Sequence, residues 1–492
     1  MYLSIDQSTS STTIFLFDKK LSLIKKISKQ HKQIYRNKDW VEHNGEEIYQ
    51  NLLKLIKNIK YKISYSKNLF VSITNQRETF IIFDSKNGKP LCNAIVWQCR
   101  RGQSICNTIA KSKAKSRFIK NSTGLELDTY FPASKLSWLL KNNKNLKEKL
   151  KKGSALFGTI DTYLIYRLTK TKSYSTDYTN ASRTLFFDNK KLEWSKKLIN
   201  LFKLDLKYLP EVKESSSIFG ETNFNNILKF KIPISGVMGD SQSSLFANQC
   251  FNNGDSKITL GTGCSILTNI GSKYQIKDKY ITTLSFVFNG KAYYSYECLI
   301  NFAGATISWL KNNLEIINSA EETNKISKFT KDSNGIFLIP AFVGLSSPHW
   351  LPNSKGMFYG LTPTANKNHL IRASLESIAF QIKDYVEELK KYQKIKFKRV
   401  CIDGGMTTNN FLMQLLSNLF QNKTNISKFE DMSAYGSLLM GLLGIKLVNN
   451  LNDLKKYKKN YIQFKPLNSR ADIKTYNSWR DVLNKYYLNK NI

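Results

Sequence analysis

The sequence predicts an α/β protein built from two similar halves. Short runs of strand-forming residues alternate with helical segments, and glycine turns interrupt them along the whole chain. A strand-turn-strand pattern opens the chain, and a second one begins near residue 232. The 492 residues, of which 41% are hydrophobic, can fill two or three compact units. We therefore expect an internally duplicated architecture with a boundary near residue 247.

The first half is expected to open with a hairpin. Residues 2–5 and 13–17 favour strands, and the loop 6–12 that joins them is rich in hydroxyl side chains. Residues 70–74 and 79–83 repeat this pattern around the turn 75–78. Helices are predicted farther along, at residues 133–140 and 146–151.

The second half is expected to begin in the same way. Residues 234–238 form a predicted strand, and residues 257–260 pair with residues 265–268 across the turn Gly261-Thr262-Gly263. A predicted helix at residues 410–420 follows the glycine turn at 403–405. Because no low-complexity linker separates the halves, we expect them to share a long interface with a cleft between them.

The composition excludes several classes of protein. The net charge of +38 comes mainly from lysines that are spread along the chain beside asparagine and isoleucine, without clusters interleaved with aromatic residues. We therefore expect no specific nucleic-acid partner, although the charge would attract anionic nucleotides. The seven cysteines contain no C-x-x-C pair, which indicates buried thiols in a reducing compartment. No apolar run approaches the length of a membrane span, so a soluble cytoplasmic protein is expected.

Two predicted turns carry the first chemical signal. Backbone N–H groups and hydroxyls in tight turns can bind phosphate oxygens, and no Walker A sequence is present. One turn combines Asp6 with Thr9, Ser10 and Ser11, and the other contains Thr262 between two glycines. Facing each other, these turns would clamp a polyphosphate, with Asp6 holding a Mg²⁺ ion. Each turn taken alone is better explained as an ordinary hairpin tip.

Polar residues at predicted strand ends are the second signal. Arg77-Glu78 and Asp240 follow apolar strands, and Trp97 ends another apolar run. Ligands of α/β folds bind beyond the carboxyl ends of strands, and an Asp there can accept a proton from an attacking hydroxyl. Structural explanations remain for each residue: a surface ion pair for Arg77-Glu78, a core aromatic for Trp97, and a helix N-cap for Asp240. The turn Asp403-Gly404-Gly405 either meets a nucleotide or is a plain turn.

Several segments of the chain resemble the glycerol kinase branch of the FGGY carbohydrate kinase family. The matching stretches extend from residue 1 to about residue 445. The segments that carry the resemblance are residues 75–79, 93–98, 130–139, 157–162, 176–184, 261–264 and 356–376.

The resemblance implies two actin-like (ribonuclease H-like) ATPase domains that enclose a cleft. Residues 1–247 would hold the polyol and the first phosphate loop, and residues 248–492 would bind the nucleotide. The implied reaction is transfer of the γ-phosphoryl group of Mg-ATP to a small polyol, with glycerol and sn-glycerol 3-phosphate as the expected substrate and product. Family relatives also imply a homo-oligomer, either a dimer or a tetramer.

The resemblance also assigns roles to individual residues. Asp240 would be the general base, and Asp6 would lie beside the metal. Glycerol would be held by Arg77, Glu78, Trp97, Tyr130 and Asp240. The nucleotide would contact Thr9, Ser10, Ser11, Thr13, Thr262, Gly304, Ser308, Gly405 and Asn409.

Departures from the family pattern concern the acceptor pocket. Ser241 stands where glutamine is usual, and Ser265 stands where an aromatic residue is usual; both positions line the substrate pocket in the family. Two hydroxymethyl groups make the pocket larger and more polar, which favours a bigger or more oxygenated substrate than glycerol. The alternative acceptor is therefore another small polyol or keto-sugar, for example erythritol, dihydroxyacetone or a pentulose. Ser8, Thr13 and Cys298 are further departures, at positions where glycine, arginine and glycine are usual. A non-catalytic sugar-binding protein of the same fold is a third reading.

Overall fold

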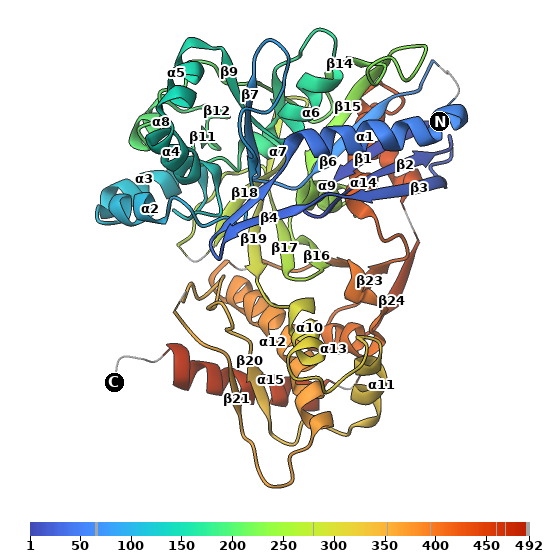
Figure 1. Cartoon of the computed structure of the whole chain (residues 1–492). Coiled ribbons are helices and arrows are strands. Elements are labelled where there is room, and N and C mark those ends of the chain that lie inside the picture. The colour runs from blue at the N-terminus through green and yellow to red at the C-terminus, as the bar shows by residue number, and fades with distance from the viewer. Residues whose placement is uncertain are drawn as a thin grey trace.

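The computed structural model describes residues 1–63, 67–278, 280–351, 353–393, 395–458, 460–467 and 469–488. Two large sheets organise the molecule, and Figure 1 shows them in separate lobes, the first in blue to green and the second in yellow to red. In spatial order the first sheet contains β14 (Ile218–Thr222), β15 (Ile232–Gly239), β6 (Val71–Asn75), β1 (Tyr2–Gln7), β2 (Ser11–Phe17) and β3 (Leu23–Gln30). The second contains β18 (Ile281–Phe288), β19 (Lys291–Ile300), β17 (Cys264–Gly271), β16 (Asp255–Leu260), β22 (Arg399–Asp403), β23 (Thr424–Ser427) and β24 (Tyr461–Phe464).

The two sheets repeat one topology. In the first, β1, β2 and β3 form an antiparallel meander, and β6 and β15 then add in parallel on the other side of β1. In the second, β16, β17 and β19 form the meander, and β22 and β23 add in parallel beside β16. The predicted internal duplication is therefore confirmed.

Smaller sheets and the helices complete the fold. A five-stranded sheet contains β4 (Gln33–Asn37), β5 (Trp40–His43), β8 (Ala94–Ile95), β7 (Phe80–Asp84) and β9 (Ala155–Thr159). Three strand pairs are β10 (Ser175–Asp177) with β13 (Glu211–Lys213), β11 (Phe187–Asp188) with β12 (Glu193–Trp194), and β20 (Phe337–Ile339) with β21 (Met357–Tyr359). The first nine helices are α1 (Gly45–Ile59), α2 (Gln103–Ala110), α3 (Lys113–Thr123), α4 (Pro132–Asn142), α5 (Lys144–Lys152), α6 (Ile160–Leu168), α7 (Tyr178–Ala181), α8 (Lys196–Leu201) and α9 (Asp240–Ala247). The others are α10 (Gly304–Asn312), α11 (Glu322–Phe329), α12 (Lys367–Gln393), α13 (Asn410–Phe420), α14 (Met432–Gly444) and α15 (Arg470–Leu483).

Most predicted elements are present, and one predicted pairing is wrong. The opening hairpin, the pairing of β16 with β17 and the helices α4, α5 and α13 lie where the sequence predicts them. Residues 70–74 and 79–83 do not form a hairpin, because β6 belongs to the first large sheet and β7 to the five-stranded sheet. The backbone of Glu78 has a φ of +64°, a left-handed conformation that non-glycine residues seldom adopt, and it turns the chain from one sheet into the other.

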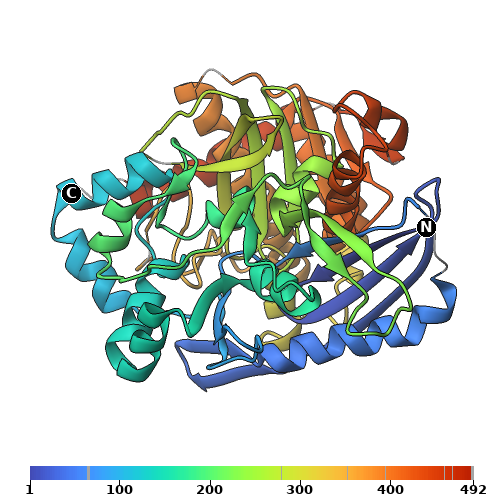
Figure 2. The ribbon, with the colours of Figure 1, turned by 90° about the horizontal axis from the view of Figure 1, so that it is seen from above.

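Two helices lie between the large sheets. α14 packs against β15, β6 and β1 of the first sheet although it comes late in the chain, and α9 packs against α14 and against β16 and β17. The contact between α9 and α14 is close, because a Cβ atom on Gly436 would lie 1.8 Å from the Ser243 carbonyl oxygen. On the opposite face of the first sheet α1 runs along β2 and β3, as Figure 2 shows in blue.

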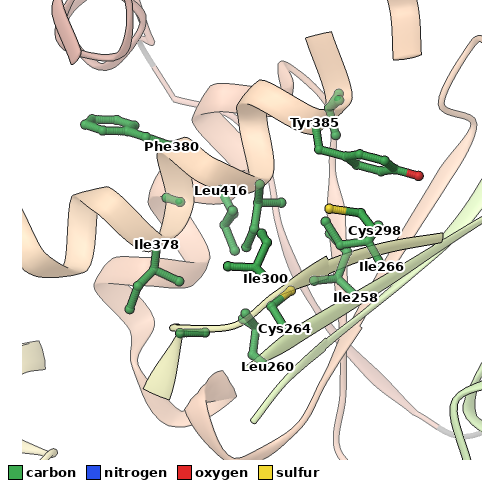
Figure 3. Close-up of a cluster of buried hydrophobic side chains, with 14 of the residues drawn as sticks. Ile258, Leu260, Cys264, Ile266, Cys298, Ile300, Ile378, Phe380, Tyr385 and Leu416 are labelled. Carbon is green, nitrogen blue, oxygen red and sulfur yellow. The ribbon is translucent and has the colours of Figure 1, made fainter. Parts of the chain in front are cut away.

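The core of the second lobe forms between its sheet and α12. Ile258, Leu260 and Ile266 on the strands belong to one buried cluster with Ile378 and other residues of the long helix (Figure 3). These side chains are almost completely buried, and each contributes about 1.5–3 kcal/mol relative to exposure. This packing covers the face of β16 and β17 that is turned toward α12. The two strands are therefore held in place, and so is the turn that connects them.

Two further sequence-based expectations bear on the class of protein. All seven cysteines are free thiols, and all except Cys92 are buried. Within the described residues no helix has the length and apolar character needed to cross a membrane.

Candidate functional site

Three parallel strands bring the predicted acidic and basic residues to one edge of the first sheet. β1 pairs with β6 and β6 with β15, so their carboxyl ends are adjacent. Asp6 lies at the end of β1, Arg77 and Glu78 follow β6, and Asp240 follows β15. The structure thus brings together residues that are far apart in the sequence, as expected for the ligand-binding edge of an α/β sheet.

Asp240 is the first residue of α9 and not its N-cap. Gly239 occupies the cap position, so the helix-cap explanation for Asp240 is wrong. The Asp240 Oδ1 atom accepts a hydrogen bond from the Ser241 N–H at 2.6 Å and lies 3.2 Å from Arg77 Nε. Its Oδ2 atom has no partner among the described residues, and the side chain is 40% exposed. One carboxylate oxygen is therefore fixed and the other is available.

Arg77 and Glu78 belong to a buried ion network and not to a surface pair. We define the network as Arg77, Glu78, Arg183 and Glu297. Arg77 Nη2 lies 2.8 Å from Glu297 Oε1, and Arg183 bridges Glu297 Oε2 at 2.5 Å and Glu78 Oε1 at 2.6 Å. All four side chains are at most 4% exposed. The surface ion-pair explanation is therefore wrong.

The charges of the network are balanced in different ways. Burial disfavours the charged form of Glu297, but the guanidinium groups of Arg183 and Arg77 outweigh it and hold the pKa below its usual value. For Glu78 burial dominates over the same two arginines, and its pKa is raised. Glu78 Oε2 has no partner in the described part of the chain, so this carboxylate keeps one oxygen for a ligand hydroxyl.

A glycine allows Arg77 to reach Asp240. A Cβ atom on Gly239 would lie 2.7 Å from Arg77 Cγ, so only glycine leaves room for the arginine side chain against the end of β15. Gln242, one turn into α9, accepts a hydrogen bond from Arg77 Nη1 at 3.2 Å. Each nitrogen of the guanidinium group thus has a protein partner, which fixes its plane.

An aromatic wall stands beside these charges. The rings of Trp97 and Tyr130 lie 5.4 Å apart and are tilted by 56°. The buried ammonium of Lys135 donates to the backbone carbonyls of Val96, Trp97 and Tyr130 at 3.1–3.2 Å. Burial lowers the pKa of Lys135 to about 8. The lysine thus joins two distant chain segments that carry the aromatic rings.

The first hairpin loop is connected to this wall. The loop comprises residues 8–10, between β1 and β2. The Trp97 indole N–H donates to the Thr9 hydroxyl at 3.0 Å, and Gln33 Nε2 donates to the Thr9 carbonyl at 2.8 Å. The Ser10 side chain is exposed at the tip, whereas the Ser11 hydroxyl lies 3.2 Å from that of Ser8.

Thr13 is farther from the tip. It lies in β2 opposite Asp6, and its hydroxyl donates to Ser28 on β3 at 2.9 Å. Of the four predicted nucleotide residues in this part of the chain, Ser10 is therefore the most accessible.

A histidine and a glutamine brace the loop from behind. His43 Nε2 lies 2.7 Å from Gln33 Oε1, and Gln76 Nε2 lies 3.3 Å from His43 Nδ1. These partners assign the neutral Nε2–H tautomer to His43. Burial lowers its pKa to about 3, with a further contribution from the neighbouring His31.

Asp6 has the properties of a cation ligand. Its Oδ1 atom is buried without a hydrogen-bond partner in the described residues. Burial raises the pKa of Asp6 to about 8, and the carboxylates of Asp240 and Asp431 add to this effect. Among the described residues no group of three or more His, Cys, Asp or Glu side chains surrounds a common point. A Mg²⁺ ion held by one or two carboxylates and by phosphate oxygens needs no such group.

The second turn is built from backbone groups. Gly261, Thr262 and Gly263 connect β16 to β17, and the Thr262 carbonyl accepts hydrogen bonds from the N–H groups of Ala303 and Ala305. Gly304, the first residue of α10, approaches so closely that an added Cβ would lie 2.6 Å from the Gly261 carbonyl oxygen. Gly404, at the end of β22, would place a Cβ 2.4 Å from the Leu260 carbonyl oxygen. Three glycine turns therefore meet at one edge of the second sheet.

The other predicted nucleotide residues surround these turns in different ways. Ser308 is exposed on α10, one helical turn after Gly304, and Gly405 has open space around it. Asn409 is buried, and its side chain caps α13 through Leu412 N–H and donates to Thr323. Thr262, Gly304, Ser308 and Gly405 thus share one region, whereas the Asn409 amide is engaged within the protein.

The two departures from the family pattern are neighbours in space. The Ser241 hydroxyl on α9 lies 3.3 Å from the Ser265 hydroxyl on β17, and both residues are partly exposed. The Ser241 backbone N–H binds Asp240 Oδ1, so one member of the pair also contacts the Asp240 carboxylate. The structure thus places two hydroxyl groups on residues that follow β15 and the glycine turn.

Three residues of the site were missed by reasoning from the sequence. Arg183 and Glu297 complete the ion network, and Lys135 holds the aromatic wall. Each is a charged residue within a segment whose neighbours are apolar or buried, which is a usable signal because buried charges require partners. Apart from the contact between Lys135 and Tyr130, their partners are 38 or more positions away in the chain, so the sequence could not identify them.

Comparisons with known proteins show the family of the chain. The N-terminal domain model of the FGGY family of carbohydrate kinases matches residues 1–247, and the C-terminal domain model matches residues 256–445. A glycerol kinase of Fusobacterium nucleatum is 39% identical over 456 residues, which cover 92% of each chain. Glycerol kinase 1 of Thermotoga maritima is 40% identical and covers 93% of this chain and 94% of the relative.

Solved structures show the same fold. The crystal structure of Plasmodium falciparum glycerol kinase with ADP is 34% identical in sequence, has a TM-score of 0.91, and covers 99% of this chain and 98% of that one. A ligand-bound xylulose kinase of Lactobacillus acidophilus, at 21% identity and a TM-score of 0.88 over 99% of this chain and 98% of its own, shares the fold alone. The predicted actin-like α/β class is confirmed, and the chain belongs to the FGGY family of carbohydrate kinases.

Proposed function

We propose that the protein transfers the γ-phosphoryl group of ATP to glycerol and forms sn-glycerol 3-phosphate. The observation that carries this proposal is the convergence of Arg77, Glu78 and Asp240 beside the ring of Trp97. Family membership supports the kinase reaction, and the relatives named glycerol kinase support the acceptor. The two lowest-ranked alternatives from the sequence, a non-catalytic sugar-binding or scaffold protein and a nucleic-acid binder, have no comparable support.

The acceptor would be held by charge on one side and by aromatic rings on the other. Glu78 Oε2 is free to accept a hydrogen bond from a hydroxyl group of the acceptor. The Arg77 guanidinium, which Glu297 and Gln242 hold in place, presents positive charge to the hydroxyl oxygens. Trp97 and Tyr130 would cover the carbon chain and exclude water. This arrangement fixes the acceptor in one orientation.

Asp240 would act as the general base. Arg77 Nε and the Ser241 N–H hold Oδ1, so Oδ2 is oriented toward the accessible side of the site. A carboxylate in this position can take the proton of the attacking hydroxyl as the oxygen–phosphorus bond forms. Most of the acceleration would come from alignment and charge neutralisation, because phosphoryl transfer requires little covalent chemistry from the protein.

The nucleotide would lie between the first hairpin loop and the second turn. Ser10 and Ser11, with Thr9, would provide hydroxyl donors, and Thr262, Gly304, Ser308 and Gly405 would approach it from the second lobe. Asp6, with its unpartnered Oδ1, would hold a Mg²⁺ ion with Asp240 close by, and the ion would screen the phosphate charge. In this proposal residues 1–247 carry most of the acceptor site and residues 248–492 most of the nucleotide site, although Ser265 and Glu297 also reach the acceptor.

A second candidate is a kinase for a larger polyol or keto-sugar. The Ser241–Ser265 pair favours it, because two hydroxyls can bind additional oxygen atoms of a four- or five-carbon substrate. Erythritol, dihydroxyacetone and pentuloses, compared with glycerol, are the acceptors that distinguish the two candidate functions.

An ADP-release assay over this panel tests both candidates. For the first we expect glycerol to have the highest kcat/KM. A four- or five-carbon acceptor with a higher kcat/KM than glycerol would replace the first candidate with the second. No phosphoryl transfer to any acceptor by folded protein with Mg-ATP would remove both.

A further inference from the structure

A cavity that no part of the proposed reaction uses opens on the first lobe. Its volume is about 830 Å³, and its walls come from β4, β5, β8, α4 and the segment that precedes β8. None of the proposed acceptor, nucleotide or metal residues lines it. The volume lies within the range typical of small-molecule sites, so the question is which chemistry would fill it.

The carboxylates that line the cavity are already neutralised. Glu42 is 6% exposed and lies 2.9 Å from Arg36 Nε and 2.6 Å from Arg101 Nη2. Glu46 is paired with Arg167, whose Nη1 lies 2.7 Å away. Lys89 has no ion-pair partner among the described residues. The cavity lining thus carries three cations, Arg36, Lys89 and Arg101, against two carboxylates, and the cavity keeps an excess of positive charge.

The free polar groups at the mouth include several donors. The Nη atoms of Arg36 have no partner in the described chain, and its side chain is 58% exposed. Asn44 and Asn143 also line the cavity, and their Oδ1 atoms are occupied as helix caps, which leaves their amide nitrogens free. Exposed donors beside an unbalanced positive charge favour an anion, and a guanidinium group matches the geometry of phosphate oxygens.

The inner wall is aromatic and rigid. The Trp40 and Trp138 rings lie 4.9 Å apart at 76°. The Arg101 guanidinium stacks on Trp40 at 4.3 Å from the ring centroid and lies 5.5 Å from that of Trp138. Cation–π contacts and the Glu42 pair fix this arrangement before any ligand binds. A bare phosphate would leave most of the cavity empty, whereas a ring-shaped body can pack on the indoles.

We propose that this cavity binds a phosphate monoester with a ring-shaped body, which is the chemistry shared by sugar phosphates and nucleoside monophosphates. The phosphate lies against Arg36 and Lys89, and the ring packs on Trp40 and Trp138. The site is separate from the proposed acceptor and nucleotide residues, so the inference does not rest on the proposed function.

Calorimetric titration of the full-length protein tests the proposal. The nucleotide site is first saturated with Mg²⁺ and a non-hydrolysable ATP analogue, so that added phosphates cannot enter it. The ligands are ribose 5-phosphate, uridine 5′-monophosphate and uridine. We expect at least one of the two phosphates to bind with a submillimolar Kd, and uridine to bind at least about tenfold more weakly. The phosphate with the lower Kd shows whether the indole rings of Trp40 and Trp138 prefer a sugar alone or a nucleoside.

Surface variants locate the binding. The double variant Arg36→Gln/Lys89→Ala should weaken phosphate binding by about tenfold or more, because it removes both exposed cations. Lys86→Ala is the matched control, since Lys86 is an exposed lysine three positions before Lys89 that does not line the cavity. Three results would each overturn the proposal: neither phosphate binds, the phosphates bind no more tightly than uridine, or the double variant leaves the Kd of the phosphates unchanged.

Discussion

The acceptor side and the nucleotide side of the site are built by different means. The acceptor side consists of charged side chains that are buried and braced against one another: Arg77, Glu78, Arg183 and Glu297. The nucleotide side of the second lobe consists of glycine turns whose contacts are backbone to backbone, as between Gly261 and Gly304. In the proposed function the first side would recognise hydroxyl groups by fixed charges, whereas the second would need only close approach of the main chain. Substitutions should therefore affect the two sides differently.

The largest effect is expected from Asp240→Asn. An amide cannot accept the hydroxyl proton, so kcat should fall about 10³-fold or more. Nucleotide affinity, measured with a fluorescent ATP analogue, should stay close to that of the parent protein. Activity that survives the substitution would refute the role of Asp240 as base and would move the search to another acceptor-side carboxylate.

Glu297→Gln should be the next largest change. Arg77 and Arg183 would each lose one of their carboxylate partners in a fully buried position, which costs about 3–5 kcal/mol of unfolding free energy. The acceptor KM should rise because Arg77 loses its orientation, while the KM for ATP should change little. Denaturant unfolding and steady-state kinetics measure the two effects.

An exposed ion pair provides the control for Glu297. Glu211→Gln removes the partner of Lys213, and the Glu211 side chain is 68% exposed, so the change in stability should stay below about 1 kcal/mol. Equal losses for the two variants would contradict the distinction between a braced acceptor side and an ordinary surface pair.

The pH dependence of stability should reveal the brace behind the first loop. His43 has a pKa of about 3 in the folded protein, below the unfolded value of about 6.5, so the unfolded chain binds more protons between these values. Stability is then fully present above pH 6.5 and is lost as the pH falls, by about 2 kcal/mol at pH 5 relative to pH 7. Denaturant unfolding at both pH values measures this loss.

The variant His43→Gln isolates this contribution. Glutamine can keep polar contacts with Gln33 and Gln76 but does not titrate, so the difference between pH 5 and pH 7 should shrink by about the same 2 kcal/mol. An unchanged pH dependence would assign the effect to other groups, such as the neighbouring His31.

On the nucleotide side, Gly304→Ala should act through the backbone. The new Cβ would lie 2.6 Å from the Gly261 carbonyl oxygen and would push the two turns apart. We expect the KM for ATP to rise about tenfold, which corresponds to about 1.4 kcal/mol, with a nearly constant acceptor KM. Gly405→Ala is the comparison variant, since its added Cβ has no neighbour within 4 Å beyond the adjoining residues. A rise in the KM for ATP in Gly405→Ala would come from direct contact with the nucleotide, and a rise in Gly405→Ala alone would contradict the steric effect proposed for Gly304→Ala.

The smallest effect is expected where the two sides are joined. Thr9→Val removes the acceptor for the Trp97 indole N–H, a hydrogen bond worth about 1 kcal/mol. The acceptor KM should rise a few-fold, and Thr9→Ser should restore it because serine keeps the oxygen. If valine alters only the KM for ATP, the contact between the loop and Trp97 has no part in acceptor binding.

Local sequence signals predicted much of this architecture but not its long-range contacts. The hairpin at the N-terminus and the turn at Gly261 were predictable because strand propensity and turn residues act over a few positions. The false hairpin at residues 70–83 arose because Glu78 adopts a left-handed backbone without the glycine that usually signals one. Asp240 and Arg77 were recognisable at strand ends, whereas the partners of Arg183 and Glu297 depend on how distant segments pack.

The way in which Lys135 holds the aromatic wall bears on how such a pocket can change its substrate. Its ammonium binds the main-chain carbonyls of Val96, Trp97 and Tyr130 and none of their side chains. The frame of the pocket is thus independent of the rings that line it. Evolution or a protein engineer can exchange Trp97 or Tyr130 for other side chains without dismantling the frame, and a family with one scaffold can adapt to acceptors of different size.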